Sequence, residues 1–216
     1  MDVYELIKKR RSIRKYRPDP IEWDKVAKIL NAGHHAPSAG NLQSWRFIVV
    51  KDPETKNKIA NAAFNQLWME TAPVHIVICA SLSRSSQTYG VRGERLYVVQ
   101  DCAMAAMSML LAAESLGLAT CFVGAFDEGQ LKRDLDIPDN ARPQGIITLG
   151  HADEKVPAPS RFRLDDLTYF GKYGTRHEEK DLFPVGQHVE PVAAAIEKLK
   201  KGRILERLKK KVKKNK

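Results

Sequence analysis

The chain has 216 residues, of which 43% are hydrophobic and 29% charged, a balance typical of a globular protein and not of a disordered or fibrous one. The net charge of +10 is unevenly distributed, because residues 191–216 hold eleven Lys or Arg against two Glu, a net +9, which leaves +1 for residues 1–190. Three cysteines without Cys-x-x-Cys spacing exclude a disulfide framework and a cysteine-based metal centre. Redox chemistry would therefore need a bound organic cofactor.

No membrane attachment is expected from the hydropathy pattern. The longest strongly apolar stretch, residues 102–113, has 12 residues, whereas a membrane-spanning helix needs about 20. The N-terminal segment MDVYELIKKRRSIRKY lacks the apolar core of a secretory signal. We therefore expect a cytoplasmic protein.

The first part of the chain alternates helical and strand patterns. Apolar residues at helical spacing predict short amphipathic helices over residues 2–10 and 22–33. Residues 34–41, with the sequence HHAPSAGN, have the composition of a tight functional loop. A β-branched strand at 47–50 follows, and the pattern then predicts a helix over 54–69.

The remainder predicts a mixed α and β domain with an appended C-terminal segment. A helix over 93–116 is apolar nearly all round between Cys102 and Ala113, which is typical of a buried helix. The other expected elements are strands at 74–80, 121–123 and 145–149, a helix at 128–135, an irregular segment over 155–190, and two helical pieces within 191–212.

Several common catalytic motifs are missing from the sequence. No G-x-G-x-x-G follows a strand, so a dinucleotide-binding Rossmann unit is unsupported. Gly124 and Gly129 have P-loop spacing, but Gln130 and Leu131 stand where that loop needs Lys and Ser or Thr. The six histidines lack metal-ligand spacing, and no G-x-S-x-G supports a serine nucleophile. We expect no metal site, and the sequence leaves a Ser-His-Asp triad unsupported but open.

An anion-binding pattern remains. Guanidinium groups match the oxygens of a phosphate, and a hydroxyl adds a neutral donor. For Arg10 and Arg11 taken alone, a solvated basic helix end is the simpler interpretation. The pattern comprises Arg10, Arg11, Ser12 and Arg14, the polar loop at 38–43, and Arg161.

Four segments together resemble the motif series of the nitroreductase-like flavoprotein family: RRSIRKY (10–16), APSAGNLQSW (36–45), GLATCFVGAFD (117–127) and VPAPSR (156–161). Their order and spacing match as well, and the resemblance covers residues 1 to about 175. It implies an α+β nitroreductase-like fold with a mainly antiparallel central sheet flanked by helices. It also implies an intertwined homodimer with FMN at the interface. Residues 176–216 would form a C-terminal extension with a basic helical tail.

The resemblance also implies which residues contact FMN. Arg10 and Arg161 would bind the phosphate, with Ser12 and Arg11 nearby, while Arg14 would lie beside the pyrimidine edge of the ring. The partner subunit would contribute the loop around Asn41. Small residues at 124 and 125 would let a backbone N–H reach flavin N5. The full set is Arg10, Arg11, Ser12, Arg14, Pro37, Ser38, Ala39, Asn41, Gln66 or its neighbour Asn65, Val123, Gly124, Ala125 and Arg161.

The implied activity is transfer of hydride from NADH or NADPH through FMN to an electron-poor small molecule, such as a nitroaromatic or a quinone, with ping-pong kinetics. Because flavin N5 would carry the chemistry, no catalytic side chain is expected, and the role of Arg14 would be electrostatic. Trp68, Phe64 and Tyr89 are candidates to line the acceptor pocket, with core packing the alternative for at least one of them. Two alternatives stay open. The basic tail would make the protein a binder of nucleic acid or an anionic surface. Otherwise the chain would bind flavin without reductase turnover.

Overall fold

The computed structural model describes residues 2–176, and the helical pieces expected within 191–212 lie outside the described residues. The chain forms two units, Met1–Val156 and Pro157–Lys216. The division after residue 175 stays a prediction.

The first unit is built on a five-stranded antiparallel sheet, as the sequence led us to expect. Its strand order is β1–β5–β3–β2, and β4 also pairs with β5. In β3, which lies between β2 and β5, Ile76 is opposite Val49 of β2 on one side and Ile147 of β5 on the other. The strands are β1 (Tyr16–Arg17), β2 (Trp45–Val50), β3 (Val74–Ser81), β4 (Ala119–Val123) and β5 (Ala141–Ala152).

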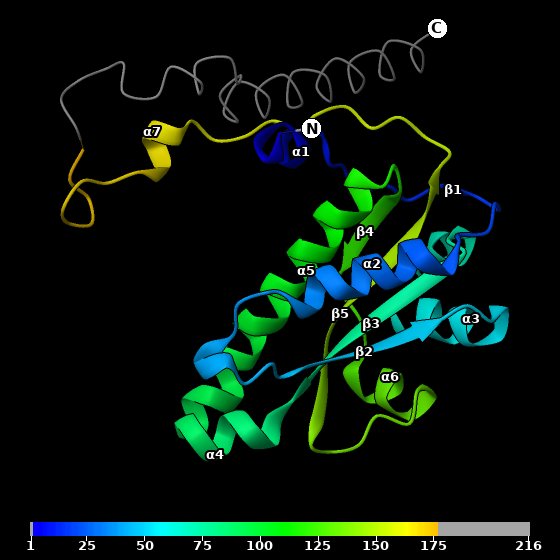
Figure 1. Ribbon diagram of the computed structural model, residues 1–216, viewed down its shortest axis with the longest axis horizontal. Coiled ribbons are helices and arrows are strands. Elements are labelled where there is room, and N and C mark those ends of the chain that lie inside the picture. Colours follow the sequence, from blue (N-terminus) through cyan, green and yellow to red (C-terminus); the bar gives the residue numbers. More distant parts are fainter. Residues whose placement is uncertain (1, 177–216) are drawn as a thin grey trace, which may run out of the picture. The chain divides into compact units, whose positions relative to one another are not determined.

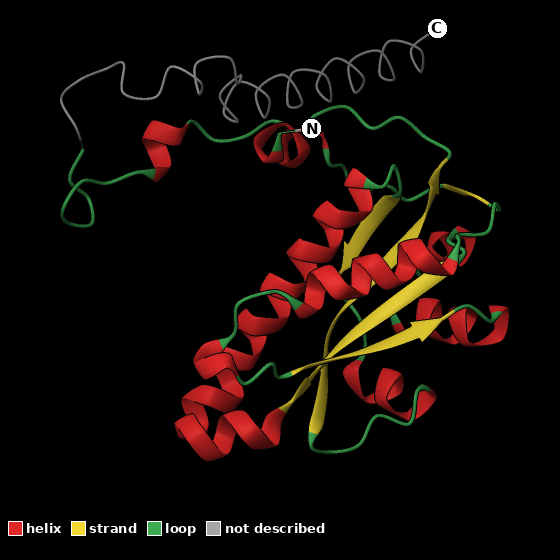
Figure 2. Cartoon of the chain, in the orientation of Figure 1, coloured by secondary structure: helices red, strands yellow, loops and turns green. Residues whose placement is uncertain are grey.

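Helices cover both faces of this sheet (Figures 1 and 2). They are α1 (Val3–Lys9), α2 (Trp23–His34), α3 (Pro53–Ala62), α4 (Leu82–Arg92), α5 (Val98–Ser115) and α6 (Glu128–Asp134), joined by the short turns η1 (Ala39–Asn41) and η2 (Leu67–Thr71) and the π-helical turn η3 (Gly93–Tyr97).

The alternation of side chains along β3 produces two cores. Ile76 and Ile78 pack into one apolar cluster with α2 and α5, while Val77 and Cys79 pack into a second with α3 and α6. Because both faces are covered, β3 is an almost continuous apolar run instead of an alternating one. The sheet thus supplies a rigid platform whose loops carry the polar residues.

The helix expected over 54–69 is wrong in its second half. The observed helix α3 ends at Ala62, and η2 follows as a separate turn. Phe64 and Asn65 both have positive φ, 57° and 58°, which an α-helix cannot contain. The sequence pattern missed this break because neither residue is a glycine or a proline. Strand β1 and helix α4 were also not expected.

Helix α5 is buried on one face only, whereas the sequence predicted a helix buried nearly all round: Met104 is 47% and Met107 38% exposed. With α4 and η3 it forms the run Leu82–Ser115, which by length and composition alone could cross a membrane. Gly90, with φ 59°, breaks its regular geometry, and 44% of its most apolar window is buried. Cys102, Ala105 and Met109 belong to the first apolar cluster. This is the packing of a core helix in a globular protein.

The second unit is described as far as residue 176. It contains the four-residue helix α7 (Leu164–Leu167). Arg163 pairs with Asp165 at 2.8 Å, and the Arg176 guanidinium lies 4.9 Å from the ring centroid of Tyr169. The rest of this described stretch is largely irregular, as expected for residues rich in Pro, Gly and aromatic side chains.

Candidate functional site

The basic segment begins where α1 ends. The backbone N–H of Arg10 donates to Leu6 O at 3.0 Å and closes the last turn of that helix. The guanidinium of Arg11 donates to the carbonyls of Lys8, Lys9 and Arg10. Cations are favourable at a helix C-terminus, because the last carbonyls lack partners within the helix. Arg11 is therefore engaged as a helix cap, which leaves Arg10 as the cation before Ser12.

The next residues are fixed against the sheet. Ser12 forms a parallel bridge with Thr120, and Ile13 N–H donates to Thr120 O at 3.0 Å. The carboxylate of Glu154 accepts hydrogen bonds from the backbone N–H groups of Arg14 and Lys15. Sequence patterns gave no signal for Glu154, since its partners lie about 140 residues away. The result is a short extended segment with a defined path.

The side chain of Arg14 lies over an aromatic ring. Its guanidinium carbon is 5.9 Å from the ring centroid of Trp68, which belongs to η2. Such cation–π contacts are modest in energy but set the position of the cation. Arg14 was predicted as a flavin contact, whereas Trp68 was a candidate for the wall of the acceptor pocket and not a predicted flavin contact.

The segments around residues 66 and 125 also meet. The side-chain amide of Gln66 donates to Ala63 O at 2.9 Å and to Ala125 O at 3.3 Å. Asp127 N–H donates to Ala62 O at 2.7 Å, which ties the same two segments a second time. At Gly124 an added Cβ would meet only Phe122, at 3.5 Å, so the backbone there is accessible. Val123, the preceding predicted residue, is buried in the strand β4.

The loop at 36–43 lies near the start of α5, whereas the segment around Ser12 lies near the end of that helix. Ala39 N–H donates to the Asp101 carboxylate at 3.0 Å, near the start of that helix. Thr120, which holds Ser12, follows the end of the same helix. At 1.5 Å rise per residue, the 14 steps from Asp101 to Ser115 span about 21 Å. Within the first unit the predicted residues therefore fall into two groups (Figure 1).

The loop itself is well ordered by local hydrogen bonds. Gln43 N–H donates to Ser38 Oγ at 3.0 Å, and the Gln43 side chain donates to Asn41 Oδ1 at 3.1 Å. Gly40 and Asn41 adopt positive φ, 56° and 54°. Pro37 precedes this turn and is exposed. The sequence correctly predicted a tight loop here.

Asp101 is the residue that the sequence reasoning missed in this group. It is the only charged side chain among residues 98–113, and it is 4% exposed. Burial raises the pKa of its carboxyl group, and Oδ2 has no hydrogen-bond partner within residues 2–176. A lone carboxylate in an otherwise apolar helix was the available signal.

An open groove of about 660 Å³ lies beside this loop, between α2, β2 and α4. It contains none of the predicted FMN contacts. Its lining residues are Ala27, Leu30, Asn31, His34, Gln43, Trp45, Arg46, Phe47 and Arg84.

Arg161 belongs to the second unit and is exposed. Its part in phosphate binding therefore stays a prediction. Within the described residues, no group of three or more His, Cys, Asp or Glu side chains is arranged to hold a metal ion.

Known proteins resemble this chain in sequence and in fold. The sequence model of the Nitroreductase family matches residues 7–68 and 63–151. An NADH dehydrogenase of Thermus thermophilus is 34% identical over 186 residues, covering 73% of this chain and 91% of the relative. An FMN reductase [NAD(P)H] of Bacillus subtilis is 31% identical over 173 residues, covering 73% of this chain and 69% of the relative.

A solved structure agrees with these sequence matches. The NADPH:FMN oxidoreductase of Vibrio harveyi, in complex with NAD+, superposes with a TM-score of 0.74 at 28% identity. The superposition covers 81% of this chain and 79% of that one.

Proposed function

The chain belongs to the nitroreductase family, and on that premise we propose that it is an NAD(P)H-dependent oxidoreductase that carries FMN. The names of its relatives support both the cofactor and the electron donor. When bound, FMN supplies two-electron hydride chemistry that no side chain of this protein offers. The residues of the chain would bind FMN, orient its ring and stabilise the charge that develops on it.

The ring end of the site is supported by the neighbourhood of Arg14, Trp68, Gln66 and Ala125. Arg14 is an exposed cation whose position is set by the Trp68 ring beneath it. A fixed cation beside the ring stabilises the negative charge that develops on reduction. At residues 124 and 125, small side chains leave a backbone N–H accessible. These features fit an electron-accepting heterocycle.

The phosphate end is assigned to Arg10, Ser12 and Arg161. Guanidinium groups bind phosphate oxygens bidentately, and a serine hydroxyl adds one further donor. Since Arg11 caps α1, we assign it the role of holding the backbone on which Arg10 and Ser12 are presented. Among the predicted FMN contacts, a direct contact from the Arg11 side chain has the least support.

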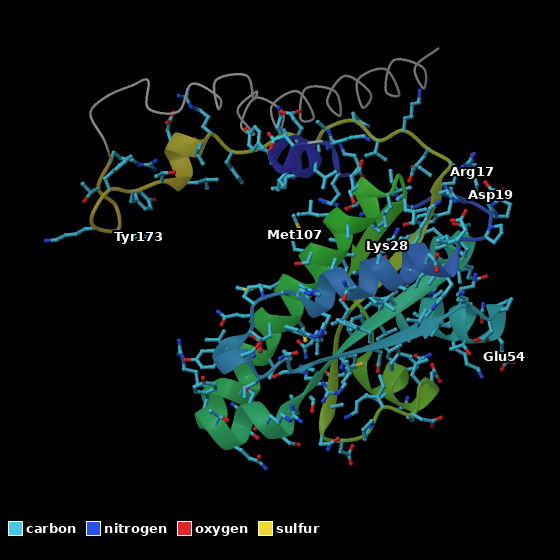
Figure 3. All side chains as sticks on the ribbon, viewed as in Figure 1. Arg17, Asp19, Lys28, Glu54, Met107 and Tyr173 are labelled. Atoms are coloured by element: carbon cyan, nitrogen blue, oxygen red, sulfur yellow. The ribbon has the colours of Figure 1, made fainter. Side chains whose placement is uncertain are left out.

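The division of the predicted contacts between the two ends of α5 is the observation that supports a homodimer. A second copy can bring its loop at 37–41 to the Arg14 end of the first, which one chain cannot do alone. Apolar side chains are available for such an interface, because Val99 is 39% exposed and Met104 47% exposed on α5. Figure 3 shows Met107 on the side of the same helix away from the sheet.

For the second substrate we propose an electron-poor small molecule such as a nitroaromatic or a quinone. Exposed apolar side chains at Phe64 and Leu67 lie next to Trp68 in the chain and offer a surface on which a planar acceptor can rest. Because donor and acceptor use the same surface in turn, ping-pong kinetics are expected.

The test is a visible spectrum of the purified full chain with added FMN, followed by anaerobic addition of NADH or NADPH. We expect stoichiometric FMN, bleaching on addition of the donor, and recovery of the colour on addition of a nitroaromatic or quinone. A protein that binds no flavin would contradict the proposal. Bound FMN that no nicotinamide donor bleaches would favour a flavin-binding protein without turnover.

A further inference from the structure

Helix α3 carries a buried lysine that points under η2. Lys56 is 9% exposed, and its ammonium donates to Ala72 O at 2.8 Å and to Glu70 O at 3.4 Å. Burial lowers the pKa of this amine, because the charged form loses its hydration. Lysines are seldom buried unless they have a specific partner, and here the partners are backbone carbonyls of one turn.

A second buried side chain binds the same turn. His75 is fully buried, and its Nε2 lies 2.9 Å from Met69 O. Because a carbonyl only accepts, Nε2 carries a proton, and the buried Nδ1 has no acceptor among residues 2–176 for a second one. Burial lowers the pKa of His75 to about 4, and the nearby charge of Lys56 adds to this effect. The carbonyls of Met69, Glu70 and Ala72 are thus all held from the core side.

The opposite side of η2 carries Trp68, over which Arg14 lies. A five-residue 3-10 turn has few internal hydrogen bonds to fix its own orientation. The Trp68 ring is partly buried against apolar core residues, and the donors beneath the turn fix the backbone that carries it. The position of the Arg14 cation depends on that ring in turn.

We propose that Lys56 is a positioning residue for flavin reduction: by holding the carbonyls of Glu70 and Ala72, its ammonium orients Trp68 and so places the Arg14 guanidinium. This rests on the proposed function, since it assigns Arg14 to the flavin ring. A buried ammonium suits the task because it offers several donors from one atom. If it left the turn, it would become a buried charge without partners.

The experiment replaces Lys56 and follows anaerobic reduction of bound FMN by stopped flow. Lys56→Met should slow reduction on the order of tenfold, because small misplacements of positioning groups cost up to about 100-fold in rate. The dissociation constant of FMN should change much less than the rate. Lys56→Arg, which keeps the charge and the donors, should recover most of the rate.

Lys58→Met is the matched control. Lys58 lies on the same helix, but its ammonium pairs with Glu54 at 2.7 Å on the exposed side, and Figure 3 shows Glu54 at the outer end of α3. The rate should equal that of the unaltered protein. An unchanged rate in Lys56→Met, or an equal loss in Lys58→Met, would overturn the proposal. If Lys56→Met does not fold, Lys56→Leu, which also lacks a donor, replaces it under the same two outcomes.

A double-mutant cycle separates positioning from general destabilisation. If Lys56 acts through the tryptophan, adding Lys56→Met to Trp68→Leu should slow reduction no further. Multiplying losses would overturn the proposal, because two independent defects add in free energy. FMN binding by the unaltered chain is measured first, so a protein without flavin counts against the proposed function and not against the role of Lys56 alone.

Discussion

The turns η1 and η2 lie in the two groups of proposed flavin contacts, η1 with Asn41 and η2 beside Gln66, and they are anchored by opposite chemistry. In η1 a backbone N–H, that of Ala39, donates to a buried carboxylate, Asp101. In η2 backbone carbonyls accept from a buried ammonium and a neutral imidazole, Lys56 and His75. Neither turn has the length to hold itself in place. Each is therefore fixed by polar side chains that reach it from a neighbouring helix or strand.

The two anchors should respond differently to substitution of the side chains that form them. Removing the acceptor of η1 leaves one N–H unpaired, whereas removing the donors of η2 leaves several carbonyls unpaired. Water can satisfy these carbonyls more easily than the single N–H. The η2 anchor also depends on a neutral histidine, so it responds to acid. Four predictions follow from this contrast, beginning with the largest effect.

Acid should weaken the η2 anchor through His75. Its pKa is lowered from 6.5 to about 4, so below pH 6.5 the unfolded chain binds a proton that the folded chain refuses until about pH 4. The free energy of unfolding should therefore fall across this interval, by roughly 3 kcal/mol at 1.36 kcal/mol per pKa unit. Urea unfolding at about pH 7 and about pH 4.5 measures it. His75→Leu should flatten this part of the profile, and an unchanged slope would contradict the assignment.

Asp101→Ala should damage the η1 anchor. The substitution leaves the N–H of Ala39 without its acceptor, and an unpaired buried polar group costs about 1–3 kcal/mol. We expect lower unfolding free energy together with weaker FMN binding in a fluorescence titration. Asp139→Ala removes an exposed carboxylate 3.6 Å from Lys132 and should cost less than about 1 kcal/mol. Equal effects of the two substitutions would show that Asp101 is no anchor.

Gly40→Ala should separate strain from contact in η1. Gly40 has φ 56°, and an added Cβ would lie 2.4 Å from the Tyr89 hydroxyl oxygen. Left-handed backbone alone costs an alanine roughly 1–2 kcal/mol. Gly117→Ala is the control, since its φ is 72° and nothing lies within 4 Å of the added atom. Thermal unfolding should show a larger loss for Gly40→Ala, and adding Tyr89→Phe should narrow the gap.

Arg14→Ala should have the smallest effect on stability, below about 1 kcal/mol, because its contact with Trp68 is an exposed cation–π pair. It should nevertheless slow flavin reduction while the protein keeps most of its FMN. Arg161→Ala should instead chiefly weaken FMN binding. Flavin content and stopped-flow reduction measure the two effects, and the reverse pattern would contradict the division of roles.

Much of the fold was predictable because its signals are local. The period-3.6 pattern at 22–33 and the β-branched run at 74–80 correspond to α2 and β3 within one residue at each end. Asp127 caps α6 through Gln130 N–H at 2.7 Å, a contact between near neighbours in sequence. The helix end at 62 has a weaker local signal: Phe64 and Asn65 are exposed residues with positive φ, a conformation in which Asn is enriched but Phe is not.

Four ordered motifs identify the family from the sequence, and with it the residue types that a flavin phosphate and ring require. How these residues are used depends on the three-dimensional fold. It placed Arg11 on the end of α1, brought Trp68 under Arg14, and separated the Asn41 loop from both by the length of α5. The physical reason is distance along the chain. Glu154, Lys56 and Asp101 act on backbone groups 16 to 140 residues away, and no local pattern records such pairs.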